Sequence, residues 1–247
     1  DSTSAIADAT DISSSSRALK IGIPTQYWSD LSPSLTKVLE EARRTLESLG
    51  HQAVSLELPH TNAATAVYYV IAGAEASTNL SRYDGIRYGH RAAAPENLED
   101  LYQFSRSEGF GSEVKRRILT GTYALSVGYY DAYYLKAQQI RRLIRQDFLD
   151  AFGEADVILT PVSPSTAFKR EALIEDPISM YQQDIYTTPA SLAGLPALSL
   201  PCGVSDEMPV GMQFIGPHFG ESSLLTLGRE YQDQTDWHAL HPADNHD

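Results

Sequence analysis

A short apolar run, Leu19–Pro24 (LKIGIP), is followed by a helical pattern over Ser34–Leu49 (SLTKVLEEARRTLESL) and by an alternating run, Ala53–Leu58 (AVSLEL). The first run closes on a proline, which is typical of a short strand. The apolar residues of the second recur at helical spacing, and Gly50 follows them as a stop signal. A strand, a helix and a second strand in this order predict a crossover unit and therefore a sheet of the α/β class.

The rest of the chain adds further helices and strands to this beginning. We expect helices over Thr65–Ser81, Asn97–Ser107 and Ser222–Asp233, and strands at Val157–Pro161, Ala197–Pro201 and Val210–Ile215. Asn97 is the expected cap of its helix, with Asp100 three residues on. The long helical region Ser112–Phe152 contains Gly121 and Gly128, which predict that it is interrupted and forms two helices.

The two ends of the chain differ in composition from its middle. Residues 1–18 are rich in Ser, Thr, Asp and Ala, and they bury too little apolar surface to offset the entropy of ordering, so we expect a polar linker. Residues 237–247 are expected to form a loose polar tail, and residues 19–236 to belong to a single domain. Because the first residue is Asp1 and not Met, we expect a piece of a longer protein.

Composition excludes several classes of function. The formal net charge of −13 argues against an autonomous nucleic-acid binder, because neutralising phosphates needs clustered Lys and Arg. The single Cys202 excludes an internal disulfide framework and predicts a reducing, cytoplasmic compartment. No apolar run approaches the roughly 20 residues that span a bilayer, and no signal peptide is visible, so no membrane partner is expected.

The common catalytic motifs do not occur in this sequence. The string nearest to a Gly-x-Ser-x-Gly elbow, Gly203–Glu207, lacks the second glycine, and Gly109–Gly111 lacks the features of a phosphate-binding loop. Of the seven histidines only His238 and His241 lie close together, in the polar tail, so no metal site is expected.

Two charged positions, Arg117 and Asp184, are the better candidates for binding. Lys115 and Arg116 are expected on a solvated helix face, whereas Arg117 borders the apolar stripe, where a partly buried guanidinium suits a carboxylate. Asp184 lies just before a Thr-Thr-Pro string, where a turn or cap carboxylate is an equally good interpretation. Tyrosine pairs such as Tyr129-Tyr130 are expected to be packing residues.

Several strings together resemble a known family. They are Tyr68–Ala72 (YYVIA), Asn79–Gly89 (NLSRYDGIRYG), Ser105–Gly111 (SRSEGFG), Gly121–Ser126 (GTYALS), Thr187–Pro196 (TTPASLAGLP) and Pro209–Gly216 (PVGMQFIG). The last two resemble the amidase-signature family as a whole. The others resemble one branch of that family, the A subunits of the glutamyl-tRNA(Gln) amidotransferases. The resemblance covers nearly the whole chain.

This resemblance implies an α/β/α layered fold around a mixed sheet, with the N-terminal part of the domain missing. It also implies a Ser–cis-Ser–Lys catalytic triad, whose serines lie in a Gly/Ser-rich stretch. Ser13–Ser16 contains no glycine and does not match that stretch. We therefore expect no catalytic residue in this chain, which would begin just after the catalytic serine and be inactive alone.

The residues that the resemblance carries over are on the substrate side. Tyr68, Arg117 and Asp184 match positions expected to hold free glutamine. The chemistry agrees with this assignment, because the α-carboxylate of glutamine suits the Arg117 guanidinium and the α-ammonium suits the Asp184 carboxylate. Tyr68 would then supply a hydroxyl near the substrate.

The resemblance further implies a heterotrimer with the B and C subunits of the amidotransferase. In that complex, ammonia released from glutamine is used with ATP and Mg, both bound by a partner subunit, to convert Glu-tRNA(Gln) into Gln-tRNA(Gln). This chain would bind no cofactor and leave the tRNA mainly to its partner. The alternatives are a general carboxamide amidase fragment and a non-catalytic scaffold subunit.

Overall fold

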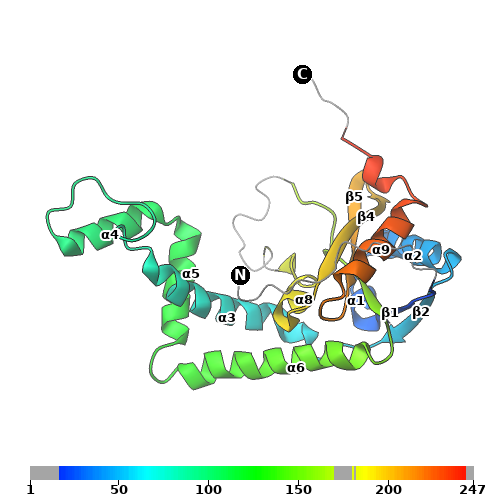
Figure 1. Cartoon of the computed structure of the whole chain (residues 1–247), viewed down its shortest axis with the longest axis horizontal. Helices are drawn as coiled ribbons and strands as arrows, with labels where there is room; N and C mark the ends of the chain where they lie inside the picture. Colours follow the sequence, from blue (N-terminus) through cyan, green and yellow to red (C-terminus); the bar gives the residue numbers. More distant parts are fainter. Residues whose placement is uncertain (1–16, 170–179, 181, 243–247) are drawn as a thin grey trace. The chain divides into compact units, whose positions relative to one another are not determined.

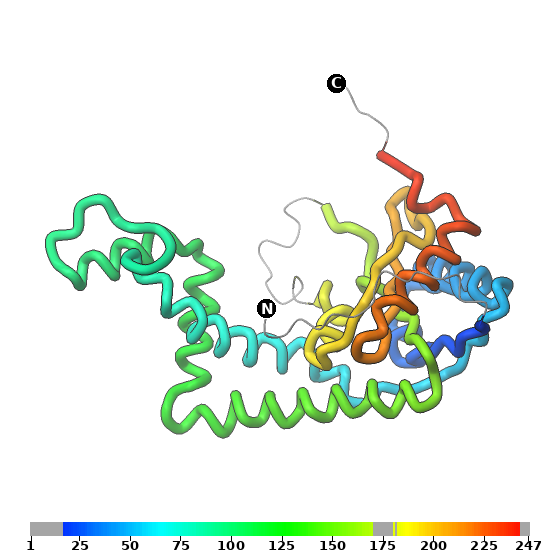
Figure 2. The backbone as a smooth tube through the Cα atoms, in the orientation of Figure 1, coloured from blue at the N-terminus to red at the C-terminus, as the bar shows by residue number. Residues whose placement is uncertain are grey.

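The computed structural model describes residues 17–169, 180 and 182–242, which fall into two compact units (Figure 1). Unit 1 combines residues 1–65 with residues 143–247, and unit 2 is residues 66–142. Figure 2 traces the backbone through both units. Residues 1–16 of the predicted linker and 243–247 of the predicted tail lie outside the described residues.

Unit 1 is built on a five-stranded mixed sheet. Its strands are β1 (Lys20–Pro24), β2 (Gln52–Leu56), β3 (Val157–Pro161), β4 (Ala197–Ser205) and β5 (Met208–Ile215), in the order β2-β1-β3-β5-β4. β1 is parallel to β2 and β3, whereas β5 is antiparallel to β3 and β4. The prediction of an α/β fold with a mixed sheet is confirmed.

The helix of the predicted crossover is α2 (Pro33–Ser48), which joins β1 to β2. Ser32 caps it, since its hydroxyl accepts a hydrogen bond from the Leu35 amide at 3.4 Å, and Pro33 occupies the first turn, where no amide donor is needed. Gly50 follows the helix with φ +96°, a conformation that glycine adopts without strain. The parallel pairing of β1 with β2 confirms the crossover unit.

Helices α2 and α9 (Glu221–Gln232) both pack on one face of the sheet (Figure 1). A Cβ atom on Gly203 of β4 would meet the side chain of Val38 in α2. A Cβ atom on Gly228 of α9 would come within 2.7 Å of Leu198 in the same strand. Glycine at these two positions therefore lets each helix approach the strand closely.

The opposite face carries α1 (Thr25–Ser29) and α8 (Thr188–Ala193). Side chains alternate along β5, so Gln213 points away from the face covered by α2 and α9. Its amide reaches the backbone carbonyl of Tyr186, just before α8, and the Tyr186 ring packs on Tyr27 of α1 with ring centroids 5.0 Å apart. Unit 1 thus has helical segments on both faces, the layered arrangement that was predicted.

One strand is longer than expected. The sequence places the end of the strand at Pro201, but β4 continues to Ser205. The register of β4 against β5 shifts between Pro201 and Gly203. Proline has no amide hydrogen to donate to the neighbouring strand. The register shift accommodates Pro201 without ending β4.

The end of unit 1 contains a short helical turn within the predicted tail. Trp237–Ala239 form a 3₁₀ turn, and the residues from Leu240 to Pro242 have no regular structure. Within the ranges that the structure describes, no helix is long and apolar enough to cross a membrane.

Unit 2 is helical. It contains most of α3 (Ala64–Asn79), all of α4 (Leu98–Gly109) and α5 (Ser112–Ala124), a π-helical turn at Tyr130–Leu135 and the first part of α6 (Lys136–Ala151). The Asn97 side chain accepts a hydrogen bond from the Asp100 amide at 2.9 Å, so the predicted cap of α4 is confirmed.

The two glycines expected to interrupt the long helical region behave differently. Gly128 lies in the turn after α5 with φ +88°, as a helix break requires. Gly121 lies inside α5, and the prediction of a break there is wrong. A Cβ atom on Gly121 would overlap the carbonyl of Gly73 in α3 and lie 2.8 Å from the Ala74 amide nitrogen. Gly121 is therefore the point at which α5 touches the backbone of α3.

This contact predicts that even one added methyl group separates the two helices. We expect Gly121→Ala to lower the free energy of unfolding by about 1–3 kcal/mol, because backbone must move to make room. Urea denaturation followed by circular dichroism measures the change. Gly111→Ser is the matched control, since a Cβ atom there meets nothing within 4 Å and serine caps a helix well. Equal stability of the Gly121→Ala variant and the wild type would contradict the close contact.

Candidate functional site

Two of the predicted site residues meet in unit 2. Tyr68 lies on α3 and Arg117 on α5, the two helices that touch at Gly73 and Gly121. The pKa of the Arg117 guanidinium is raised above its ordinary value, first by a hydrogen bond to Glu113 and also by a hydrogen bond to the Tyr68 hydroxyl. The structure therefore brings Tyr68 and Arg117 together, and the Arg117 side chain is 37% exposed.

Glu113 is a member of this cluster that was not singled out from the sequence. Its carboxylate accepts from Arg117 Nε at 3.0 Å and also pairs with Arg116. The spacing from Glu113 to Arg117 is i to i+4, which puts the two side chains on one helix face, so the sequence contained the signal. The Glu113 carboxylate accepts the hydrogen bond of Arg117 Nε and so orients the remaining donors of the guanidinium.

The ring of Tyr69 completes the surroundings of the guanidinium. Arg117 Cζ lies 5.9 Å from the Tyr69 ring centroid, within the range of a cation–π contact. Tyr68 and Tyr69 pack edge to face with their centroids 5.1 Å apart. A half-exposed cation held by a carboxylate and two aromatic side chains can bind a carboxylate ligand with little loss of side-chain entropy.

The third predicted residue, Asp184, belongs to unit 1. It lies in the segment before α8, where its backbone carbonyl accepts from the amides of Thr187 at 3.2 Å and Thr188 at 3.0 Å. Its side chain is exposed, and no side chain in the described part of the chain donates a hydrogen bond to its carboxylate. The turn at this position thus depends on the backbone of Asp184 and leaves the carboxylate available.

The segment of Asp184 is attached to the sheet by a buried amide. Gln213 of β5 is only 5% exposed, and its Nε2 donates to Thr160 Oγ1 at 2.9 Å and to the Tyr186 carbonyl at 3.2 Å. Tyr186 is buried and lies two residues after Asp184. Gln213 is therefore a positioning residue for this segment, and nothing in its sequence context predicts that role.

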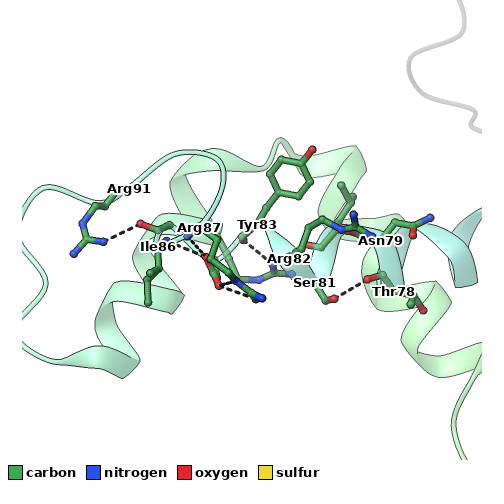
Figure 3. A network of polar contacts seen from close by, with 12 residues as sticks. Thr78, Asn79, Ser81, Arg82, Tyr83, Ile86, Arg87 and Arg91 are labelled. Carbon is green, nitrogen blue, oxygen red and sulfur yellow. Dashed lines mark hydrogen bonds and ion pairs between the residues drawn. The ribbon is translucent and has the colours of Figure 1, made fainter. Parts of the chain in front are cut away.

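Unit 2 also contains an ordered loop formed by the Asn79–Gly89 string (Figure 3). The Asp84 carboxylate accepts from the amides of Ile86 and Arg87, both at 2.9 Å, and from Arg87 Nε at 3.0 Å. Arg91 donates to the carbonyl of Gly85 at 3.1 Å. These bonds lower the pKa of Asp84 to about 2, first through the two backbone amides and then through the Arg87 side chain.

The tyrosines after α5 are more exposed than a packing role predicts. Tyr129, Tyr130 and Tyr133 are 39%, 44% and 46% exposed. Tyr123 and Tyr129 have ring centroids 4.3 Å apart, and a hydrogen bond to Tyr129 is the first cause that raises the pKa of Tyr123 to about 12. Their rings pack mainly on one another, beside the π-helical turn.

No cluster of three or more His, Cys, Asp or Glu side chains suited to a metal ion occurs among the residues that the structure describes.

Comparison with known proteins identifies the class to which this fold and these residues belong. The family model described as Amidase matches residues 1–225, and the chain therefore belongs to the amidase family. Within the family it is similar to the A subunit of the glutamyl-tRNA(Gln) amidotransferase of Hahella chejuensis, with 56% identity over 248 residues, or 98% of this chain and 51% of that protein. The A subunit of Coxiella burnetii (strain RSA 493 / Nine Mile phase I) is 53% identical over 94% of this chain and 48% of that protein.

Solved structures agree with this classification. The crystal structure of the A subunit of the glutamyl-tRNA(Gln) amidotransferase from Thermotoga maritima superimposes with a TM-score of 0.66 at 38% identity, covering 88% of this chain and 42% of that one. A bacterial aryl acylamidase of the amidase-signature family gives a TM-score of 0.69 at 18% identity, over 94% of this chain and 47% of that one, and shows the shared fold alone. The chain spans about half the length of the curated relatives it matches.

The buried amide of Gln213 leads to a prediction about unit 1. Gln213→Leu leaves the Thr160 hydroxyl and the Tyr186 carbonyl without their donor, and we expect it to lower the free energy of unfolding by about 1–3 kcal/mol. Amide hydrogen exchange in residues 182–188 should accelerate in the same variant. The exposed Gln139→Leu serves as the control. Unchanged exchange in the Asp184 segment would show that Gln213 does not position it.

The low pKa of Asp84 leads to a pH-dependent prediction. Its folded-state pKa of about 2 lies below the ordinary value of 3.8, so its stabilising effect is present above the ordinary value and is lost as the pH falls toward 2. We expect Asp84→Asn to remove this part of the acid sensitivity. Urea denaturation at several values between pH 5 and pH 2 measures it, with the exposed Asp131→Asn as control. Parallel pH curves for wild type and Asp84→Asn would contradict the assignment.

Proposed function

We propose that this chain is the glutamine-binding portion of the glutamine-hydrolysing subunit of a tRNA-dependent amidotransferase. The observation that carries the proposal is the cluster of Tyr68, Glu113 and Arg117, in which a half-exposed guanidinium is held ready for a carboxylate. Similarity to the A subunits of two bacterial amidotransferases over nearly the whole chain supports the same conclusion.

The proposed substrate explains why an anion and a cation are both needed. Free glutamine carries an α-carboxylate and an α-ammonium group, so a site that recognises it needs a group of each sign. Arg117 would bind the α-carboxylate through its free guanidinium donors, with the Tyr68 hydroxyl beside it. Asp184, whose carboxylate is exposed, would bind the α-ammonium. Its attachment through Gln213 would hold it in place.

The rest of the proposed activity is what the resemblance to the family implies. A Ser–cis-Ser–Lys triad outside this chain would attack the glutamine side chain, form an acyl-enzyme and release ammonia, with backbone amides stabilising the oxyanion. The B and C subunits would complete a heterotrimer in the cytoplasm. One partner subunit would use ATP and Mg to activate Glu-tRNA(Gln) and accept the ammonia, handling the tRNA, while this chain itself binds no cofactor and is inactive alone.

Two alternative functions, a general amidase and a scaffold subunit, predict different activities. A general amidase fragment would act on carboxamides that lack an amino-acid backbone and would gain nothing from a cation for an α-carboxylate or an anion for an α-ammonium group. A scaffold subunit would bind partners but support no ammonia release. The cluster around Arg117 favours the glutaminase over both.

The test uses this chain joined to the N-terminal half of the Hahella chejuensis relative, which would supply the triad. Ammonia release from glutamine is measured as a function of glutamine concentration. We expect Arg117→Ala to raise the Michaelis constant for glutamine about 10- to 100-fold. This is the loss of affinity expected when one charge-assisted hydrogen bond to the substrate is removed. Asp184→Asn should raise it as well, and Tyr68→Phe should have a smaller effect.

Arg116→Ala is the matched control, because Arg116 is the neighbouring arginine on the same helix and pairs with the same Glu113. An unchanged Michaelis constant in Arg117→Ala would refute the binding assignment. Equal turnover of glutamine and of a simple carboxamide would favour the general amidase. Ammonia release by the chain without its N-terminal half would refute the proposal that the chain is inactive alone.

A further inference from the structure

A second surface of unit 2 is not used by the proposed glutamine site. It lies on the loop after α3 and on helices α4 and α5, and we call it the aromatic–basic surface. Its members are Tyr83, Tyr88, Arg106, Phe110, Lys115 and Leu119. The ring of Tyr83 lies 6.2 Å from that of Tyr88 and 6.4 Å from that of Phe110, so the aromatic part of the surface is continuous.

One part of the aromatic–basic surface is a pocket. It has a volume of about 290 Å³, and it is lined by the apolar Phe110, Ile118 and Leu119 together with Arg106, Ser107 and Lys115. Leu119 is 72% exposed, which is unusual for a leucine in the middle of a helix. A pocket whose lining combines apolar side chains with two cations suits an apolar side chain that has carboxylates next to it.

The cations of this surface differ from the neighbouring Arg116 in having no carboxylate partner in the described part of the chain. Arg106 donates to the carbonyls of Leu80 at 2.9 Å and Tyr83 at 3.0 Å, and its Cζ lies 5.0 Å from the Phe110 ring centroid. Lys115 makes no ion pair within the described ranges, whereas Arg116 pairs with Glu113. The charge of Arg106 and Lys115 is therefore available to an acidic partner.

The loop that presents Tyr83 and Tyr88 is held in place before any partner binds. The hydrogen bonds from the Ile86 and Arg87 amides to the Asp84 carboxylate fix the turn of this loop. Gly85 has φ +75°, and a Cβ atom there would come within 2.7 Å of the Ser105 Cβ on α4. The Ser105 hydroxyl in turn accepts from the Ala92 amide at 3.0 Å. A surface ordered in this way loses little conformational entropy on binding.

We propose that the aromatic–basic surface binds a segment of a partner protein in which an apolar side chain is flanked by carboxylates. The apolar side chain would enter the pocket of Phe110 and Leu119, and the carboxylates would pair with Arg106 and Lys115. This inference rests on the proposed function, which supplies the partner: another subunit of the amidotransferase.

The composition of the surface favours a protein over a nucleic acid. Tyr, Phe and Arg are residue types enriched at the centres of protein interfaces. Unit 2 contains ten Lys and Arg against eight Asp and Glu, too small an excess to hold a polyanion. The rest of the chain contains nine Lys and Arg against 24 Asp and Glu, so its field repels a long polyanion such as RNA, whereas a few carboxylates need only the local cations Arg106 and Lys115.

The test measures association of the joined protein described above with the purified B and C subunits, by biolayer interferometry. We expect Lys115→Glu and Leu119→Glu each to weaken binding about tenfold or more, because each places a negative charge against the carboxylates of the partner. Val127→Glu is the matched control, since Val127 is a fully exposed apolar residue of the same unit outside the surface. Circular dichroism shows which variants are folded. If Leu119→Glu does not fold, the binding measured with Lys115→Glu decides the result.

The possible outcomes separate this inference from its alternatives. Unchanged binding in both variants would overturn it, and so would equal weakening by Val127→Glu. Loss of tRNA binding with intact binding of the B and C subunits would overturn it in favour of RNA, and loss of self-association alone would overturn it in favour of a second copy of this chain. Ammonia release is measured in the same preparations: surface-dependent binding by a protein that releases no ammonia would support this inference and contradict the proposed function.

Discussion

The side-chain amide of Gln213 is buried in the sheet of unit 1 and donates to both the Thr160 hydroxyl and the Tyr186 carbonyl. A buried amide without partners would cost free energy, so the strand β5, the strand β3 and the segment before α8 must keep these positions together. The packing of the Tyr186 ring against the tilted ring of Tyr27 adds α1 to the same arrangement. The segment that carries the exposed Asp184 carboxylate is thus attached to the sheet of the unit through Gln213.

In unit 2 the corresponding constraint is the contact of two glycines. Gly73 and Gly121 let the backbones of α3 and α5 touch, and this contact brings Tyr68 on one helix to Arg117 on the other. The neighbouring cations have separate surroundings. Arg116 and Arg117 share Glu113, whereas Arg106 is bound only to carbonyls and an aromatic ring among the described residues. The two proposals therefore assign the same residue type to a small carboxylate in one place and to an acidic protein segment in the other.

Local patterns in the sequence predicted the regular structure well where a neighbouring segment did not override them. Apolar spacing located α2, and Asn97 marked the start of α4. Two prolines with the same local context had different outcomes: Pro161 ends β3, whereas β4 continues past Pro201 because β5 keeps pairing with it across a register shift. Gly121 and Gly128 differ in the same way, since only Gly128 has a positive φ and Gly121 serves a contact with another helix.

The sequence by itself determined the α/β class, the family and the candidates Tyr68, Arg117 and Asp184, because apolar periodicity and short strings are properties of neighbouring residues. Spacing alone also contained the Glu113–Arg117 pair, which lies on one helix face. Only the tertiary structure decided that Gln213 holds the Asp184 segment and that Tyr83, Phe110 and Leu119 share an exposed surface with available cations. Gln213 and Tyr186 are 27 residues apart, and no local pattern fixes which segments meet when hydrophobic burial folds the chain.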